Sequence, residues 1–126
     1  NRKTKFDFLS RDEAVVKKYI DDPLCGFVCP NSFFIDLIDG LDFIHDTENL
    51  HKMNKSLPVL LISGSDDPVG DYGKGVDKVE QMFISHELKR VDKIIYPEAR
   101  HELINEINKQ EVYKDLLNWI FKIFPN

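Results

Sequence analysis

The stretch Pro58-Val59-Leu60-Leu61-Ile62-Ser63-Gly64-Ser65-Asp66-Asp67-Pro68 begins as an apolar, β-branched run and ends as a polar loop. A second run, Lys93-Ile94-Ile95-Tyr96, leads into the loop Pro97-Glu98-Ala99-Arg100-His101. Short apolar runs that are bounded by turn residues predict buried strands. An Asp and a His therefore each follow the end of a predicted strand, which is where an open α/β sheet carries its chemistry.

Helices are predicted before, between and after these two strands along the sequence. A capping box at Ser10-Arg11-Asp12-Glu13 opens the first helix, and Asp21-Asp22-Pro23 ends it, because the residue before a proline leaves the α region. Asn31 or Ser32 is predicted to cap a second helix, and a short helix or turn follows over residues 47–55. Amphipathic helices are also predicted between the strands and after them, over residues 74–89 and 110–124.

The order strand, helix, strand, helix in the second half predicts the α/β class, with a parallel pair of strands and a right-handed crossover. Two parallel strands alone would make a poor fold, because parallel sheets are covered on both faces and exposed edges invite pairing. We therefore expect more sheet before Asn1 and, for this chain by itself, a homo-oligomer. In the second helix, one apolar stripe is predicted at Phe34, Leu37, Ile38, Leu41 and Ile44.

Composition narrows the possible environments and partners. The 126 residues carry a formal net charge of −5, which argues against nucleic acid and anionic membrane surfaces as partners. No apolar run approaches the roughly 20 residues that span a bilayer, and no signal peptide is visible. The two cysteines, Cys25 and Cys29, are too few for a disulfide framework. We expect free thiols in a reducing cytoplasm.

The loop residues after the strands suggest acid–base chemistry. An imidazole can take a proton near neutral pH, and a carboxylate behind it fixes the tautomer of the ring. His101 supplies the imidazole, whereas both Asp66 and Asp67 could supply the carboxylate. Asp66 lies nearer the strand, while Asp67 precedes Pro68, which stiffens the loop, so the residues alone leave the choice open. The spacing of Asp66, Asp67 and Asp71 does not fit a calcium loop, and no metal or organic cofactor is expected.

The tract Gly64-Ser65-Asp66-Asp67-Pro68-Val69-Gly70, followed by Tyr96-Pro97-Glu98-Ala99-Arg100-His101-Glu102, resembles the C-terminal part of the serine α/β-hydrolases. The similarity is to lysophospholipases, monoacylglycerol lipases and serine aminopeptidase-like proteins. The tract Phe6-Asp7-Phe8-Leu9-Ser10-Arg11-Asp12, with Asp21-Asp22-Pro23-Leu24, is similar to the stretch that leaves the helical cap in that group.

This resemblance implies an organisation and a pair of site residues. Residues 1–50 would form the end of the cap and a helical segment, and residues 51–126 would form the C-terminal strand-helix-strand-helix of the core. Asp67, which directly precedes the proline, would be the catalytic acid, and His101 would be the base. Relatives often carry Gly where this chain has Glu98, so we expect a stiffer His101 loop here.

The nucleophile of such a triad is absent from the 126 residues. The family carries it on a Gly-x-Ser-x-Gly elbow, and no serine of the chain has that context. Ser63 and Ser65 only flank Gly64, and neither Cys25 nor Cys29 lies in an elbow that could replace the serine. We expect a C-terminal portion of a hydrolase of lysophospholipid-like or monoacylglycerol-like acyl esters that is inactive by itself. Peptidase activity on the same fold and a non-enzymatic interaction or oligomerisation module remain the alternatives.

Overall fold

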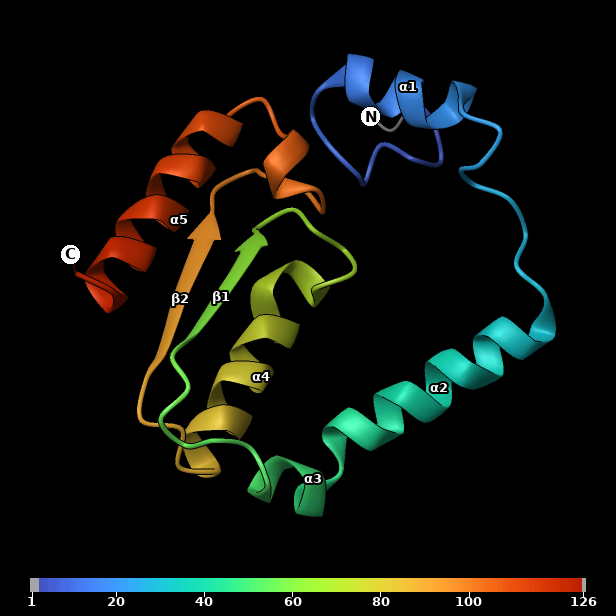
Figure 1. Cartoon of the computed structure of the whole chain (residues 1–126). Helices are drawn as coiled ribbons and strands as arrows, with labels where there is room; N and C mark the ends of the chain where they lie inside the picture. The colour runs from blue at the N-terminus through green and yellow to red at the C-terminus, as the bar shows by residue number, and fades with distance from the viewer. Residues whose placement is uncertain (1–2, 126) are drawn as a thin grey trace.

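Two parallel strands form the centre of the chain, and the computed structural model describes residues 3–125 of it (Figure 1). Strand β1 (Val59–Gly64) and strand β2 (Val91–Tyr96) pair in register from Val59 opposite Val91 to Gly64 opposite Tyr96. The parallel pairing confirms the prediction from the order of elements. The last residues of the two strands, Gly64 and Tyr96, lie opposite each other. The loops that follow the strands therefore start side by side at the same edge of the sheet.

The two faces of the sheet are covered by different helices. Helix α4 (Lys74–Ser85) connects the strands, and helix α5 (Lys109–Ile123) follows β2 (Figure 1). Successive side chains of a strand point to opposite faces. On β2, Lys93 contacts Asp77 and Glu80 of α4, whereas its neighbour Ile94 packs against the core cluster that includes Val112 of α5. The core thus lies mainly between the strands and α5.

Helix α4 ends earlier than the sequence predicted. The predicted helix extended to residue 89, but α4 stops at Ser85 with His86 as its C-cap. Glu87 has a φ of 65°, and this left-handed backbone cannot continue a right-handed helix. The turn buries Leu88 and leads directly to β2.

Helix α1 (Glu13–Asp21) begins two residues later than a capping box at Ser10 would place it. Asp12 is the N-cap, because its carboxylate accepts the N–H of Ala14. Ser10 instead donates its hydroxyl to the carbonyl of Asn105 and accepts the N–H of Asp12. The assignment of Ser10 as the cap is therefore wrong, and the predicted end before Pro23 is confirmed by the extended backbone of Asp22.

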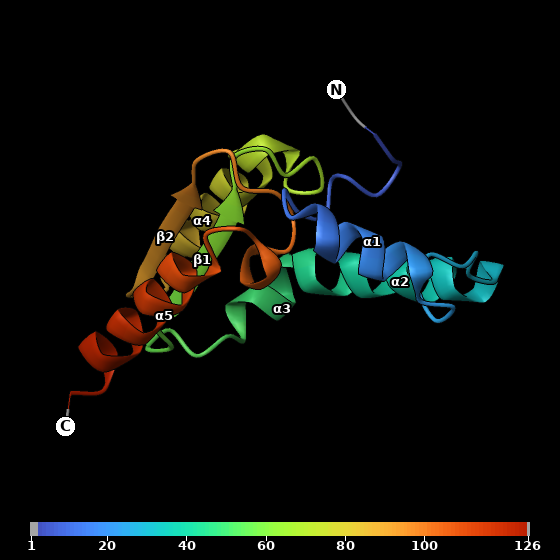
Figure 2. The ribbon, with the colours of Figure 1, turned by 90° about the horizontal axis from the view of Figure 1, so that it is seen from above.

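Helices α2 (Asn31–His45) and α3 (Thr47–His51) form an arm that leads away from the sheet and returns to it. The predicted cap at Asn31 or Ser32 is wrong, because the N-cap of α2 is Pro30, whose fixed φ suits the residue before a helix and which makes no side-chain cap hydrogen bond. Figures 1 and 2 show α2 lying apart from the strands, while α3 lies near the C-terminal end of α4. The rings of His51 and His86 are 5.0 Å apart at this contact. Within residues 3–125 no element buries the apolar stripe of α2, which is 44–57% exposed at Phe34, Leu37, Ile38, Leu41 and Ile44.

As for membrane insertion, none of the helices in the described part of the chain combines the length and the apolar character that crossing a bilayer requires.

Candidate active site

The loops that follow β1 and β2 are bonded to each other at the carboxyl edge of the sheet. The N–H of Ser65 donates to the carbonyl of Tyr96 at 2.9 Å, and the N–H of Asp66 donates to the carbonyl of Ala99 at 2.9 Å. The backbone of Glu98 donates in turn to Oγ of Ser65 at 2.8 Å. A Cβ atom on Gly64 would lie 2.0 Å from the carbonyl oxygen of Ala99, so only glycine permits this approach.

Asp67 and His101 meet where these loops converge. Oδ2 of Asp67 lies 3.1 Å from Nδ1 of His101, and Oδ1 of Asp67 accepts the N–H of Val69 at 2.9 Å. Asp67 is only 6% exposed, and its hydrogen bonds to His101 and Val69 hold the carboxylate in one orientation. The imidazole is more open, with 41% of its side chain exposed, and its second nitrogen, Nε2, makes no hydrogen bond to residues 3–125.

The structure places the other candidate carboxylate elsewhere. Asp66 is exposed and accepts a hydrogen bond from the hydroxyl of Ser65 at 3.2 Å. In the described part of the chain, the carboxylate that contacts His101 is that of Asp67. The residue types alone could not distinguish the two, because which of two adjacent side chains turns inward depends on how the loop packs.

The N-terminal segment, residues 3–11, lies against the His101 loop, which is formed by residues 97–102. The carbonyl of Phe8 accepts the N–H of His101 at 3.1 Å, and the carbonyl of Leu9 accepts the N–H of Glu102 at 2.7 Å. The ring of Phe8 lies 6.1 Å from the imidazole, centroid to centroid. The guanidinium of Arg100 donates to two carbonyls of the same segment, those of Asp7 and Ser10. Segments more than 90 positions apart therefore share the support of His101.

Sequence reasoning missed a buried carboxylate beside this loop. Glu106 is fully buried and accepts N–H groups from Arg11, Arg100 and Ile107. Burial pushes the pKa of its carboxyl up, but the donors from Arg100, Arg11 and Ile107 outweigh burial, and the net pKa lies below its usual range. No local pattern signals this role, because Arg11 and Glu106 are 95 positions apart.

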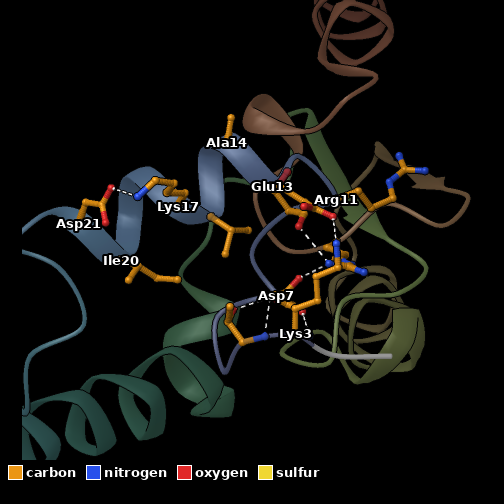
Figure 3. A pocket seen from close by; sticks show the side chains of 12 residues that line it. Lys3, Asp7, Arg11, Glu13, Ala14, Lys17, Ile20 and Asp21 are labelled. Atoms are coloured by element: carbon orange, nitrogen blue, oxygen red, sulfur yellow. Dashed lines mark hydrogen bonds and ion pairs between the residues drawn. The ribbon is translucent and has the colours of Figure 1, made fainter.

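Among the pockets of the described residues, two are bordered by Arg100, the residue before His101. The larger, of about 570 Å³, lies between the N-terminal segment and α1 (Figure 3). Several of its charged groups pair with each other, as Lys3 does with Glu13 and Lys17 with Asp21, so it presents little unpaired charge. The smaller, of about 290 Å³, is lined by Asp7, Phe8, Asp66, Pro68, Tyr72 and Arg100, which include the neighbours in sequence of Asp67 and of His101.

Within residues 3–125, the side-chain hydrogen bond of the His101 ring goes to Asp67, and none goes to a serine or a cysteine. Ser63 is buried and donates to the carbonyl of Gly64, and Ser65 supports the backbone of Glu98. Cys25 and Cys29 are free thiols, and burial and the nearby Asp22 carboxylate raise the pKa of Cys25, which disfavours the nucleophilic thiolate. Across residues 3–125, no three His, Cys, Asp or Glu side chains are grouped as metal ligands would be.

Comparison with known structures connects this geometry to enzymes. A carboxyl esterase from Bacillus coagulans, described as highly thermostable and solved with glycerol, is 31% identical with a TM-score of 0.84, and the match covers 98% of this chain and 40% of the esterase. A lipase in its open form is 25% identical with a TM-score of 0.79, over 94% of this chain and 39% of the lipase.

A monoacylglycerol lipase from Paleococcus ferrophilus shares the fold at 20% identity, with a TM-score of 0.72 over 94% of this chain and 44% of the lipase. The chain thus spans about two-fifths of the length of these solved structures. A comparison with curated proteins gives no match. The family model described as serine aminopeptidase, S33, matches residues 1–108. With that match and these structural neighbours, the chain belongs to the serine aminopeptidase S33 family and shares its α/β-hydrolase fold.

Proposed function

We propose that the chain supplies the acid and the base of a Ser–His–Asp triad in an acyl-ester hydrolase. Asp67 is the acid, His101 is the base, and the serine lies outside these 126 residues. The single observation that carries the proposal is the 3.1 Å contact between Oδ2 of Asp67 and Nδ1 of His101. This contact holds a proton on Nδ1 and leaves Nε2 free to act as the base.

In the proposed reaction, Nε2 of His101 takes the proton from the serine hydroxyl as the serine oxygen attacks the ester carbonyl. Asp67 stabilises the imidazolium that forms, and the imidazolium then gives its proton to the leaving alcohol. A water molecule, deprotonated by the same nitrogen, hydrolyses the acyl-enzyme and regenerates the serine. The steps need no metal or organic cofactor.

The proposed substrate is a lipid monoester such as a monoacylglycerol or a lysophospholipid. The names of the related structures, a carboxyl esterase and lipases, support an ester rather than another acyl derivative. Under this proposal, residues 1–50 form the end of a cap and a helical segment, and residues 51–126 belong to the catalytic core. A cytoplasmic location, predicted from the two cysteines, is part of the same proposal.

The proposal includes that the 126-residue chain by itself has almost no activity. A missing nucleophile and missing oxyanion donors each lower the rate on the order of 10² or more. The test is to incubate the chain with an activated acyl ester and to search the coding sequence upstream of Asn1 for Gly-x-Ser-x-Gly. Turnover by the chain that a serine-directed covalent inhibitor abolishes would contradict the proposal, and so would a parent gene without such an elbow.

A peptidase acting through the same pair is the second candidate, because the matching family model is described as a serine aminopeptidase. Acyl transfer from an amide uses the same base and acid, so the Asp67–His101 geometry serves both. Parallel assays of the longer protein with a monoacylglycerol and with an aminoacyl amide would separate the two.

A third candidate is an interaction or oligomerisation module without catalysis. In the described residues the sheet has two strands, so each strand has an unpaired edge, and the apolar stripe of α2 is exposed. Both features favour assembly of the chain with itself, which we propose as a homo-oligomer.

A further inference from the structure

The buried carboxylate of Glu106 lies at the junction of three segments. It is fully buried and directly follows the short helix Leu103–Asn105 in the chain. Oε1 accepts two backbone N–H groups, from Arg100 at 2.9 Å and from Arg11 at 3.0 Å. Oε2 accepts Nε–H of Arg11 and the N–H of Ile107, both at 3.0 Å. One carboxylate thus satisfies four donors.

Two of these donors belong to the His101 loop and to the N-terminal segment that lies against it. Arg100 directly precedes His101, and Arg11 ends the N-terminal segment whose carbonyls at Phe8 and Leu9 bind His101 and Glu102. Through Oε1 alone, Glu106 is therefore hydrogen-bonded both to the His101 loop, at Arg100, and to the end of the N-terminal segment, at Arg11. Without it, two N–H groups in the interior would lose their acceptor, and the loop would relax to find others.

We propose that Glu106 is a positioning residue, which fixes the His101 loop against the N-terminal segment so that Nδ1 of His101 stays within bonding distance of Asp67. The inference rests on the proposed function, in which Asp67 and His101 form part of a triad. Glu106 acts through the backbone of Arg100 and makes no contact with the reacting groups.

The site requires a carboxylate rather than an amide. A glutamine offers one acceptor oxygen and one NH₂ group. The NH₂ group would face N–H donors, and it cannot accept hydrogen bonds from them. The ion pair with Arg11, whose Nη2 also donates to Asn108 at 2.8 Å, compensates the buried charge. The lowered pKa of Glu106 agrees with a carboxyl that stays ionised in this place.

The test is to record nitrogen NMR spectra of the imidazoles in the chain and in Glu106→Gln, together with amide hydrogen exchange. We expect His101 to carry its proton mainly on Nδ1 in the wild-type chain and to shift toward the Nε2–H tautomer in Glu106→Gln. The amides of His101 and Glu102 should exchange about tenfold faster or more in the variant, as expected for the loss of a hydrogen-bonded support.

The matched control is Asp92→Asn. Asp92 is likewise a carboxylate that accepts several N–H groups, here from the side chains of Arg90 at 2.9 Å and Trp119 at 2.7 Å, but it lies at the opposite end of β2 from the His101 loop. We expect this variant to leave the tautomer of His101 unchanged. A change of equal size in Asp92→Asn would overturn the proposal, because general loosening would then explain the effect.

The outcomes separate this proposal from the proposed function. If Asp67→Asn leaves the tautomer of His101 unchanged, the triad assignment fails whatever Glu106 does. If Asp67→Asn changes it and folded Glu106→Gln does not, Glu106 has no positioning role while the triad stands. Should Glu106→Gln not fold, Glu106→Asp decides, since it keeps the charge but shortens the side chain and withdraws the carboxylate from the backbone N–H groups of Arg11 and Arg100. A smaller shift of the same kind supports the proposal, and a wild-type spectrum overturns it.

Discussion

Nδ1 of His101 lies 3.1 Å from Oδ2 of Asp67, although 34 positions separate the two residues. The even register of the parallel strands, with Gly64 opposite Tyr96, starts both loops at the same level. The absence of a side chain at Gly64 then lets the loops touch through Ala99. The contact is therefore a product of strand register and of one close backbone approach.

The triad proposal predicts that Asp67→Asn lowers kcat for ester hydrolysis by roughly 10³–10⁴ in the protein that carries this chain together with its serine. The amide cannot stabilise the imidazolium and favours the wrong tautomer of His101. Steady-state kinetics with a short-chain acyl ester would measure the loss. Asp66→Asn is the matched control, because Asp66 is exposed and its carboxylate accepts from Ser65 rather than from His101, and it should change kcat by at most a few-fold. Equal losses in both variants would contradict the assignment of Asp67.

Gly64→Ala should destabilise the chain by about 1–3 kcal/mol, because the new Cβ would lie 2.0 Å from the carbonyl oxygen of Ala99 and force the loops apart. Urea unfolding followed by circular dichroism would measure the free energy of unfolding. Gly40→Ala is the control, since a Cβ there meets nothing within 4 Å in the interior of α2. That variant should gain roughly 0.5–1 kcal/mol from better helix propensity. A neutral Gly64→Ala would show that the loops do not need this approach.

Glu98→Gly should stabilise the chain by about 0.5–1 kcal/mol. Glu98 has a φ of 59°, a left-handed conformation that strains any residue with a Cβ atom. Its carboxylate is 84% exposed and 3.9 Å from Arg11, an ion pair that contributes little. Thermal unfolding would detect the gain, and Glu98→Ala, which keeps the strained Cβ, should not show it. An equal gain in the alanine variant would trace the effect to the carboxylate instead.

Stability should fall at high pH because of Tyr96. Burial raises the pKa of Tyr96 from 10.0 to about 12, with a smaller effect from the carboxylate of Asp115, which accepts a hydrogen bond from the hydroxyl of Tyr96. The folded state therefore holds the proton more tightly than the unfolded state. The protonated phenol of Tyr96 therefore contributes roughly 2–3 kcal/mol to the free energy of unfolding. This contribution is fully present below about pH 10 and is lost as the pH rises to about 12.

Urea unfolding at a series of alkaline pH values would show this loss as a difference between the wild type and Tyr96→Phe. The phenylalanine variant lacks the phenol, so its stability should fall less steeply over the same range. The lysines titrate in both proteins and cancel in the comparison. Parallel curves for the two proteins would contradict the prediction.

The exposed stripe of α2 predicts self-association of the chain. Light scattering at micromolar concentration should report a dimer or a larger assembly, because the stripe and the strand edges expose apolar surface and unpaired backbone groups. Leu37→Glu combined with Leu41→Glu should shift the chain toward the monomer, whereas Asp39→Ser, at an exposed polar position of the same helix, should not. A wild-type chain that is monomeric at these concentrations would end this prediction.

The local elements could be predicted from the sequence because their signals lie within a few residues. Apolar runs beside turn residues identified both strands, and the spacing of apolar residues identified α2, α4 and α5. Errors occurred where a single side chain or backbone angle decides a boundary. Asp12 rather than Ser10 caps α1, and the positive φ of Glu87 ends α4 early.

The sequence by itself determined that an Asp and a His follow two parallel strands, because residue order and hydrophobic pattern are properties of the chain. The residue types left Asp66 and Asp67 open and only the family resemblance favoured Asp67; the tertiary structure turns Asp67 toward the imidazole, since that orientation depends on contacts between loops. It also brought Arg11 to Glu106 across 95 positions, a pairing that no local pattern encodes. Long-range packing satisfies buried polar groups, and its partners become visible only once the chain has folded.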